Sequence, residues 1–530
     1  MKASALDVIS AVSLYLGGAL SLGFLLSWYF LRGRDGLKSL FGCFALGLTA
    51  LYLLVLFQLS LTGITGVLVG SIVGAVALAI WRRNQRLFRL NSVTYACYAL
   101  FVGLSLLAGW TILERMFYEP VYQWDARIVW YLHAKQLFFS NGLSADTGIV
   151  FPNSQGVYHP GYPLLMPAIS AYIAHYVGFW NDYFPKANLF ILFLGLLIAM
   201  LSARSIHWAW KTIMVVMMVG FNPYMMSVGY NPLFLTLGYM DGWLAIYAGL
   251  CLLFLALYVR HGSREYLFNA ITTGFLLPGI KNEGALLTLI IFGCYAVGLL
   301  LFNLRDRRFI QFHLKTWLRF WPIVVMGVLP LVVWSQYKNR WNAQVKDYDF
   351  SRLKQFGDYG TIFSDEKMAL IDANYTDRVF LGNYWYLYLL LVAATVIYCW
   401  VTALSTKNWR RLGQELTLSL SSGLVFVGLM IVVYCLSVHD LTWHLSTSAD
   451  RLGLHSYYLV GIGMLTMISQ LHYQAYRPAK RKHEEATPVK KRAALNQAVA
   501  GPVTPAPAME TTTTNRRDAG KKASARKQKR

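Results

Sequence analysis

The sequence predicts an all-α polytopic membrane protein with about thirteen transmembrane helices. Hydrophobic residues make up 56% of the 530-residue chain and charged residues only 14%, whereas soluble proteins carry about a quarter charged residues. Apolar stretches of about 18 residues or more, long enough to cross a bilayer as a helix, recur from end to end. The sequence lacks the short alternating strands that a membrane barrel would need.

The predicted spans follow the long apolar runs in chain order. The first, 6–31, has neither a basic start nor a clear small-residue cleavage site, so we interpret it as a retained helix and not as a signal peptide. The thirteen predicted ranges are 6–31, 38–58, 62–80, 93–113, 185–203, 211–227, 241–260, 264–281, 284–302, 317–335, 384–404, 415–437 and 452–472.

The positive charges predict which side of the membrane each loop faces. The net charge is +23, and Lys and Arg cluster in short loops and in the C-terminal tail. This distribution is typical of cytoplasmic loops and does not favour nucleic-acid binding. With thirteen spans all the basic loops fall on one side and the N-terminus lies outside. That arrangement requires 163–180, although apolar enough to cross, to form a surface or re-entrant helix at the outer face.

This topology divides the chain into five segments and places its long loops outside. We expect the last segment to be a disordered basic tail in the cytoplasm, because its composition cannot bury a core. The segments are a three-helix part at 1–92, a core at 93–335 with surface helices on its external loop 114–184, a second external loop at 336–383, C-terminal helices at 384–472 and the tail at 473–530.

Ionisable residues near the outer ends of the spans are the first candidates for a site, because a charge near lipid costs a few kcal/mol unless it is paired or faces water. Asp125 follows Trp124 in the first external loop, and Asp241 begins a span. Each could instead cap a helix. A carboxylate at the mouth of a helix bundle can also hold a cation or orient a hydroxyl group.

Two further positions carry charges close to predicted spans. Lys281 and Glu283 lie in a short turn within LLPGIKNEGALL, and their apolar surroundings favour a ligand site over a merely solvated turn. Arg451 begins the last span at the outer face, against the positive-inside tendency. Its guanidinium suits a phosphate, although snorkelling to the interface is the alternative.

The short third external loop gives a weak metal-site prediction. Histidine and aspartate are common metal ligands, but exposed loops often hold them without binding a metal. The residues concerned are His439, Asp440, His444 and Asp450.

Five short motifs, taken in order, resemble the GT-C superfamily of integral-membrane glycosyltransferases, and within it the branch of protein O-mannosyltransferases and the lipid A aminoarabinose transferase. The motifs are WDA at 124–126, HPGYPLLMP at 159–167, GYMDGWLA at 238–245, GIKNEG at 279–284 and DRLGLH at 450–455. The resemblance covers 93–302 and the last span. Two features depart from it: three additional spans precede this region, and Asp125 is followed by Ala126 where those enzymes often have Glu.

The resemblance implies a polyprenyl-phosphate-linked sugar as donor and a glycan, lipid or protein as acceptor. It implies that Asp125 is the general base and that Asp241 supports the site, with Asp125 and Asp241 as ligands of a divalent cation, Mg²⁺ or Mn²⁺. The other residues that it implies in substrate or lipid-phosphate binding are Lys281, Glu283, Arg127, Lys135, His159 and Arg451.

The chemistry of inverting sugar transfer agrees with this set, because it needs one base for the acceptor and positive charge near the leaving phosphate. The resemblance also implies a bacterial inner-membrane protein with its site facing the periplasm. One alternative is a secondary transporter that uses Asp241, Lys281 and Glu283 as a proton or ion relay. Others are a ligase or polymerase of lipid-linked polysaccharides and a non-enzymatic scaffold.

Overall fold

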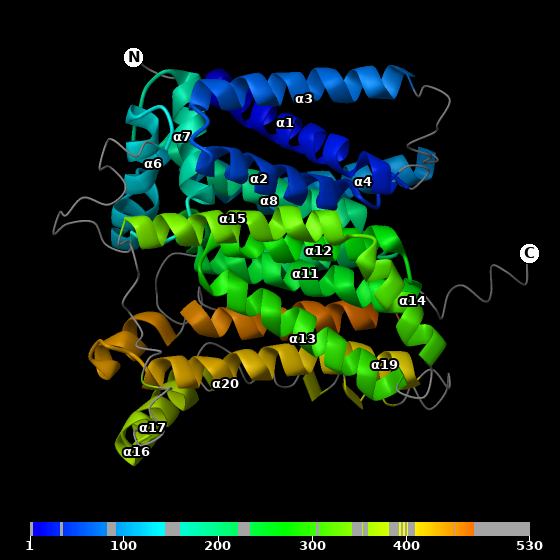
Figure 1. Cartoon of the computed structure of the whole chain (residues 1–530), viewed down its shortest axis with the longest axis vertical. Helices are drawn as coiled ribbons and strands as arrows, with labels where there is room; N and C mark the ends of the chain where they lie inside the picture. Colours follow the sequence, from blue (N-terminus) through cyan, green and yellow to red (C-terminus); the bar gives the residue numbers. More distant parts are fainter. Residues whose placement is uncertain are drawn as a thin grey trace, which may run out of the picture. The chain divides into compact units, whose positions relative to one another are not determined.

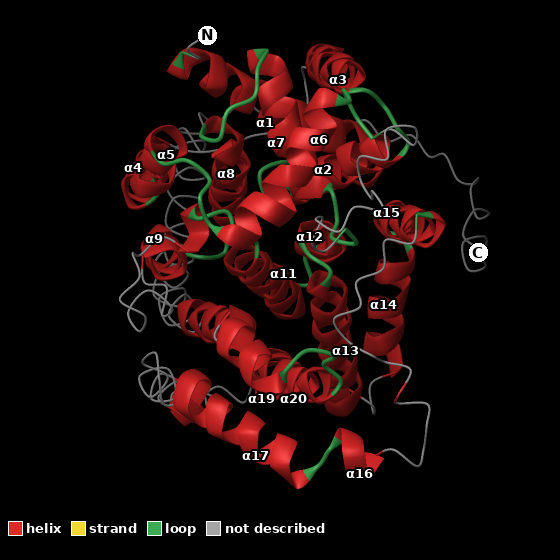
Figure 2. Cartoon of the chain, turned by 90° about the vertical axis from the view of Figure 1, so that its left-hand side faces the viewer, coloured by secondary structure: helices red, strands yellow, loops and turns green. Residues whose placement is uncertain are grey.

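The helices follow the apolar runs of the sequence, and loops join them. The structure is a computed structural model, in which Met1–Tyr473 form one compact unit and Gln474–Arg530, the predicted tail, a second. Figure 2 shows only helices and loops among the described residues. The described residues are 4–31, 35–81, 92–143, 160–220, 234–303, 307–341, 352, 359–380, 392–393, 396–397, 400, 409–449 and 451–470.

The α-helices, most of them labelled in Figure 1, follow one another along the chain, and short 3-10 or π-helices lie between some of them. In chain order they are α1 (Ala5–Leu31), α2 (Leu40–Leu56), α3 (Leu61–Trp81), α4 (Ser92–Ala108), α5 (Trp110–Tyr118), η1 (Ala126–Trp130), α6 (Tyr131–Phe139), α7 (Leu165–Val177), η2 (Phe184–Lys186), α8 (Ala187–Ser202), α9 (Trp208–Val215), η3 (Val216–Gly220), η4 (Phe234–Thr236), α11 (Asp241–His261), α12 (Arg264–Ile280), α13 (Glu283–Asn303), α14 (Arg307–Leu318), α15 (Trp321–Arg340), α16 (Tyr359–Ile362), α17 (Asp365–Asn374), η6 (Tyr375–Phe380), α19 (Trp409–Leu416), η7 (Thr417–Ser421) and α20 (Ser422–Cys435). A last helix runs over Arg451–Gln470.

Seven helices among the described residues are long and apolar enough to cross a membrane, or eight if one bent pair counts as a single span. The chain is thus an all-helical membrane-type protein, with fewer such helices than the thirteen predicted. The bent pair is Ile310–Leu318 and Trp321–Arg340, which meet at 61°. The seven are Ala5–Leu31, Leu61–Trp81, Phe184–Ser202, Asp241–His261, Glu283–Asn303, Arg411–Cys435 and Arg451–Gln470.

The other predicted spans fall short for identifiable reasons. Helix α2 has 17 residues. Helix α4 also has 17, because the helix is interrupted at Gly109. Helix α12 has 17 residues and buries polar side chains such as Asn269. The apolar helix at Trp208–Val219 is also short, and the prediction for 384–404 lies largely outside the described residues.

Helix α7 corresponds to the segment 163–180, which is apolar enough to cross but was predicted to be a surface or re-entrant helix. It has 13 residues, so it is about 20 Å long and cannot cross a hydrocarbon core of about 30 Å by itself. In Figure 1, α6 and α7 run across the ends of helices such as α2 and α8 instead of alongside them. The residues Leu165–Ala174 of α7 are buried among the other helices, and the placement of this segment at the outer face stays a prediction.

Glycines bring α1 and α2 close together. Gly23 of α1 faces the carbonyl group of Cys43, and Gly47 of α2 faces the carbonyl group of Ala19. A Cβ at either glycine would overlap these backbone atoms. Small residues at a contact allow helices in a membrane to pack backbone against backbone. The two glycines therefore fix the distance between the first two helices.

We expect Gly47→Ala to destabilise the protein by about 1–3 kcal/mol, because the new methyl group must push α1 and α2 apart. Thermal unfolding of the purified protein in detergent measures this. Gly66→Ala in α3 is the matched control, since nothing lies within 4 Å of a Cβ placed there. Equal melting temperatures for the two variants would contradict the close contact.

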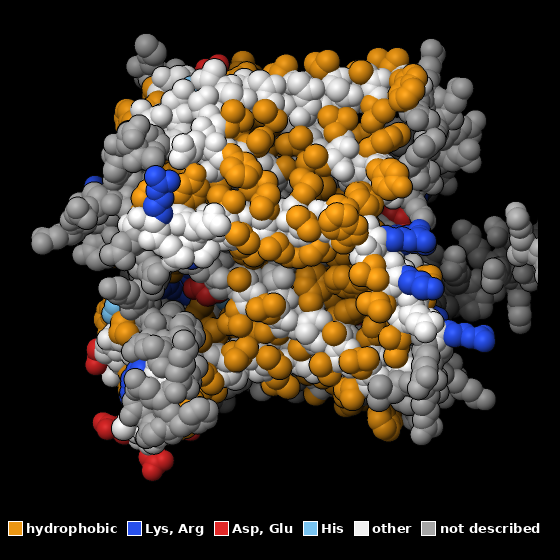
Figure 3. Space-filling view, viewed as in Figure 1, with side chains coloured by type: hydrophobic (Ala, Val, Ile, Leu, Met, Phe, Trp, Pro, Cys, Tyr) orange, Lys and Arg blue, Asp and Glu red, His pale blue; other side chains and the backbone are white. Residues whose placement is uncertain are grey.

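Chain direction places charged residues at two opposite ends of the helices. Helix α11 begins at Asp241 and ends next to Arg260, and α12 runs back from Arg264 to Lys281, where α13 begins at Glu283. We call the end with Asp241, Lys281 and Glu283 the site end, and the opposite end the basic end. Figure 3 shows hydrophobic side chains over the middle of one face and Lys and Arg side chains along its right edge.

A buried ion pair ties two helices together at the basic end. Arg260 of α11 donates two hydrogen bonds to Glu415 of α19, at 2.7 and 2.6 Å. Only 7% of the Arg260 side chain and 2% of the Glu415 side chain are exposed. This pair is similar in burial to the one between Asp241 and Lys281 at the site end, which makes it a natural control for that pair.

Candidate functional site

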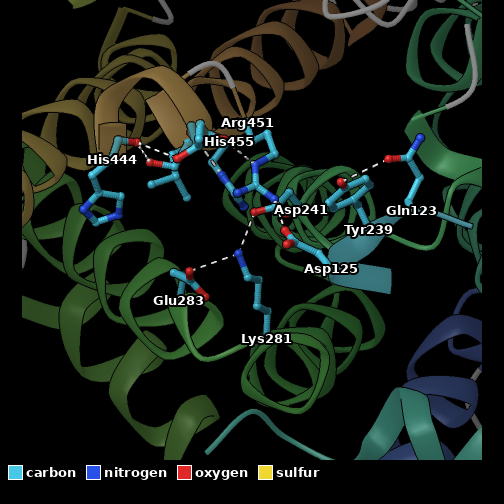
Figure 4. Close-up of polar contacts among 12 residues, drawn as sticks. Gln123, Asp125, Tyr239, Asp241, Lys281, Glu283, His444, Arg451 and His455 are labelled. Atoms are coloured by element: carbon cyan, nitrogen blue, oxygen red, sulfur yellow. Dashed lines mark hydrogen bonds and ion pairs between the residues drawn. The ribbon is translucent and has the colours of Figure 1, made fainter. Parts of the chain in front are cut away.

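Five charged residues that are far apart in the sequence converge at the site end (Figure 4). Nη1 of Arg451 lies 2.6 Å from Oδ2 of Asp125 and 3.9 Å from Oδ2 of Asp241. Nζ of Lys281 donates to Oδ1 of Asp241 at 2.6 Å and lies 3.1 Å from Oε1 of Glu283. We call these five residues the charge cluster. It brings together the first long loop, α11, the α12–α13 turn and the last helix.

The turn between α12 and α13 places Lys281 and Glu283. Lys281 caps α12 in an extended conformation, which ends the helix after Pro278. Gly284 allows α13 to begin at once, since a Cβ there would overlap the carbonyl group of Leu277. The sequence PGIKNEG therefore makes a tight turn in which Lys281 reaches Asp241 and Glu283 reaches Lys281.

Asp125 does not act as a helix cap. It has helical backbone angles immediately before the π-helix η1, and its side chain makes no capping hydrogen bond. Its carboxylate is paired with Arg451 instead. The Asp125 side chain is 30% exposed, whereas that of Asp241 is 3% exposed. Of these two carboxylates, only Asp125 is therefore open to a ligand from solvent.

Asp241 holds two cations in place. Its Oδ1 accepts from Lys281, and its Oδ2 faces Arg451. A buried carboxylate costs much free energy unless it is paired and hydrogen-bonded. The position of Asp241 at the first residue of α11 adds the favourable field of a helix N-terminus. This residue fixes the geometry of the cluster.

Backbone and aromatic contacts fix Arg451. Its Nε donates to the carbonyl group of Thr447 at 3.0 Å, and its guanidinium lies 5.3 Å from the ring centroid of Tyr239. Gly238, next to Tyr239, has a φ of +94°, and a Cβ there would come within 2.7 Å of Ala126. The glycine thus lets the turn before α11 pack directly against the segment that carries Asp125.

The segment 160–164 lies against Lys281. The ring centroid of Tyr162 is 5.8 Å from Nζ of Lys281 and 5.3 Å from the ring of Trp130. The carbonyl group of Gly161 accepts hydrogen bonds from Asn282 and Trp334, at 3.3 and 3.2 Å. The motif HPGYP therefore contributes to the surroundings of the cluster, although His159 itself lies outside the described residues.

The structure does not place Arg127 and Lys135 in the charge cluster. Both residues are exposed. Residues two apart on a helix face different sides, so Arg127 cannot share the direction of Asp125. Lys135 occupies an exposed position of α6. The prediction that these two cations bind the same phosphate as Lys281 and Arg451 has no support in this geometry.

The predicted metal sites do not fit the side chains that are present. Within the described residues, no group of three or more His, Cys, Asp or Glu could hold a metal ion. Arg451 bridges Asp125 and Asp241, and Lys281 occupies the other oxygen of Asp241. A divalent cation would have to displace both of these side chains.

The third external loop uses its predicted metal ligands for local contacts. Asp440 Oδ1 accepts from the backbone N–H of Trp443 at 2.8 Å, and the ring of His439 packs against Trp443. His444 Nδ1 lies 2.7 Å from the Ser437 hydroxyl. Asp450 lies outside the described residues.

Three residues at the cluster were not predicted from the sequence. Tyr162 and Tyr239 lie in two of the motifs that carry the resemblance, and each ring packs against a cation. His455 is fully buried one helical turn after Arg451, within electrostatic reach of Asp241. The signal for His455 was its spacing in DRLGLH, because residues four apart lie on one face of a helix.

The fold and the cluster define a class: an all-helical membrane-type protein with several apolar helices and ionised side chains gathered at one end of them. No family model matches the chain, and neither a curated protein nor a solved structure matches it. The GT-C resemblance therefore depends on the short motifs and on where their residues lie.

Proposed function

We propose that the chain is an integral-membrane glycosyltransferase that moves a sugar from a polyprenyl-phosphate donor to an acceptor hydroxyl at the external face, with inversion. The observation that carries the proposal is the charge cluster, which combines one partly exposed carboxylate, Asp125, with two fixed cations, Lys281 and Arg451. A lipid-linked donor carries its leaving phosphate at the level of the headgroups, and helix ends lie at that level.

In the proposed reaction, Asp125 accepts the proton of the acceptor hydroxyl as the oxygen attacks the anomeric carbon. A new carbon–oxygen bond forms on one face of the sugar, and the bond to the phosphate oxygen breaks on the other face. The polyprenyl phosphate leaves with the bonding electron pair, and Lys281 and Arg451 stabilise its negative charge. Asp241 touches no substrate in this scheme and positions the two cations. Glu283 holds Lys281 from its other side.

The distribution of charge supports an orientation. The basic end carries Arg260 and Arg264, and positive loops stay in the cytoplasm. The site end then faces the periplasm of a bacterial inner membrane, with the tail in the cytoplasm. A glycan, a lipid or a protein could serve as acceptor from that side.

A secondary transporter is the second candidate, since Asp241, Lys281 and Glu283 could relay a proton or an ion. Transporter sites lie near the middle of the membrane, at interrupted helices. Here Asp241 and Glu283 are the first residues of α11 and α13, and Lys281 caps α12. This position at helix ends favours the transferase. A polysaccharide ligase or polymerase would use the same donor and differ in its acceptor.

The proposal is tested by incubating the purified protein in nanodiscs with a bacterial lipid extract that contains polyprenyl-phosphate sugars and with an envelope fraction as acceptor. We expect the enzyme to consume donor and release free polyprenyl phosphate, which mass spectrometry detects. A protein that neither binds nor consumes any such donor would exclude this function. Ion flux in sealed vesicles without sugar transfer would favour the transporter.

We expect Lys281→Ala to weaken binding of undecaprenyl phosphate by about 10- to 100-fold, the effect of losing one charge-assisted hydrogen bond. Fluorescence-detected titration of the protein in zwitterionic nanodiscs measures this. Lys367→Ala on α17 is the control, because that side chain lies outside the charge cluster. An unchanged dissociation constant for Lys281→Ala would assign this lysine to structure alone.

A further inference from the structure

The charge cluster and the helix that carries Arg451 contain two buried acceptor atoms without a donor. Nδ1 of His455 lies 3.0 Å from the carbonyl oxygen of Leu452. A carbonyl can only accept, so Nδ1 carries the proton and Nε2 of the neutral ring is an acceptor. Within the described residues Nε2 has no hydrogen-bond partner, and neither has Oε2 of Glu283. An unsatisfied buried polar atom lowers stability and calls for an explanation beyond packing.

His455 is surrounded by the charges of the cluster. Asp241 of α11, Lys281 at the end of α12 and Glu283 of α13 all lie within its electrostatic reach. Arg451 of its own helix lies one turn away, on the same face. Figure 4 shows His455 beside Arg451 and Asp241.

The aromatic residue that packs against the imidazole carries no titratable group. The ring of Phe426, from α20, packs against His455 with its centroid at 5.2 Å. The ring is therefore held in place, and the groups that respond to its charge are those of the cluster.

The cluster has one negative charge in excess. Its carboxylates are Asp125, Asp241 and Glu283, and its cations are Lys281 and Arg451. An anionic ligand that binds these two cations increases the excess and competes with Asp241 for both partners. Among these five residues and His455, the group that can gain a positive charge is His455.

We infer that His455 takes up a proton at Nε2 when a phosphate anion binds to Lys281 and Arg451. This inference rests on the proposed function, because it assumes an anionic donor at these cations. The proton comes from water, and the imidazolium then serves as a counter-charge for Asp241. Protonation also turns Nε2 from a buried acceptor without a partner into a donor. His455 is thus a positioning residue whose charge follows the occupancy of the site.

The sign of the pH dependence follows from linkage. Binding that takes up a proton strengthens as the pH falls and weakens as it rises, by at most about tenfold per pH unit for one linked proton. Imidazoles in proteins titrate over roughly pH 5 to 8, so binding is measured across this range.

Calorimetry of the full-length protein in zwitterionic nanodiscs tests the inference. The probe is farnesyl methyl phosphate, a phosphodiester that does not itself titrate in this range. Titrations in two buffers with different ionisation enthalpies give the number of protons taken up on binding. We expect up to one proton for the wild type and none for His455→Asn, whose amide can still donate to the carbonyl group of Leu452.

The control is His313→Asn, which replaces another buried histidine, on α14 next to the Tyr295 hydroxyl. This variant should keep the proton uptake. Binding of the probe to the wild type without proton uptake overturns the inference and leaves the proposed function standing. Uptake that persists in His455→Asn, or in His455→Gln if the first variant fails to insert, overturns it as well. Failure of the probe to bind at any pH counts against both proposals.

Discussion

Asp125→Asn is expected to reduce sugar transfer by about 10²- to 10⁴-fold, the usual contribution of a general base. The amide keeps the size of the side chain but cannot take the proton of the acceptor hydroxyl. The substitution also removes the ion pair with Arg451. Because the Asp125 side chain is 30% exposed, we expect folding and insertion to survive. Turnover with a defined donor measures the rate, and size-exclusion profiles measure folding.

The control for Asp125 is Asp372→Asn on α17, an exposed aspartate whose Oδ1 accepts from the Thr376 hydroxyl. It should transfer sugar at the wild-type rate. Asp125→Glu keeps a base at a shifted position and should retain more activity than Asp125→Asn. Wild-type turnover in Asp125→Asn would remove this residue as the base.

Asp241→Asn is expected to have the largest effect on stability, a loss of about 3–5 kcal/mol, because it removes the negative partner of a buried cation. Lys281 would keep only Glu283, and Arg451 only Asp125. Thermal or denaturant unfolding in detergent measures this loss. We also expect lipid-phosphate binding per folded molecule to weaken, since the two cations lose their common anchor.

Glu415→Gln at the basic end separates stability from function. It breaks a buried pair with Arg260, at 2% exposure of the Glu415 side chain, so a similar destabilisation is expected. Its lipid-phosphate affinity per folded molecule should stay unchanged, because Arg260 lies at the opposite end of α11 from Asp241. A cost below about 1 kcal/mol for Asp241→Asn would contradict a buried pair at this site.

The long apolar helices could be predicted from the apolar runs alone. A long uninterrupted apolar segment in a membrane forms a helix, because a helix satisfies its own backbone hydrogen bonds. The seven long helices each coincide with a predicted range. The shorter ones could not be judged in this way. Asn269 in α12 is buried and hydrogen-bonded to the backbone of Lys38 and Gly42. Hydrogen bonds between distant segments allow a polar side chain to be buried in the core. Hydropathy does not detect such bonds, so it does not predict that the side chain is buried.

The members of the charge cluster could be predicted because charges beside apolar runs are costly and therefore meaningful. Asp125, Asp241, Lys281, Glu283 and Arg451 were named for this reason, and they lie together. Their pairing could not be predicted. No pattern in the chain indicates that Arg451 lies between the two aspartates, where the resemblance implied a metal ion.

Side-chain direction and long-range contacts could not be predicted either. The resemblance implied Arg127 and Lys135, and both lie outside the charge cluster, because the direction of a side chain depends on helical phase. His455 was overlooked because a lone histidine in an apolar run looks like a core residue. Its importance follows from Asp241 and Lys281, which lie at least 170 positions earlier in the chain and reach it only in the folded state.

The π-helix η1 limits how the loop that carries Asp125 can change in length. It occupies Ala126–Trp130, between Asp125 and α6. Each residue added to or removed from a helical segment rotates the residues before it by about 100° relative to the residues after it. A one-residue insertion or deletion here would leave α6 packed as it is and turn the Asp125 carboxylate away from Arg451. The number of residues between Asp125 and α6 is therefore constrained by the ion pair between Asp125 and Arg451. The packing of α6 alone would not constrain it.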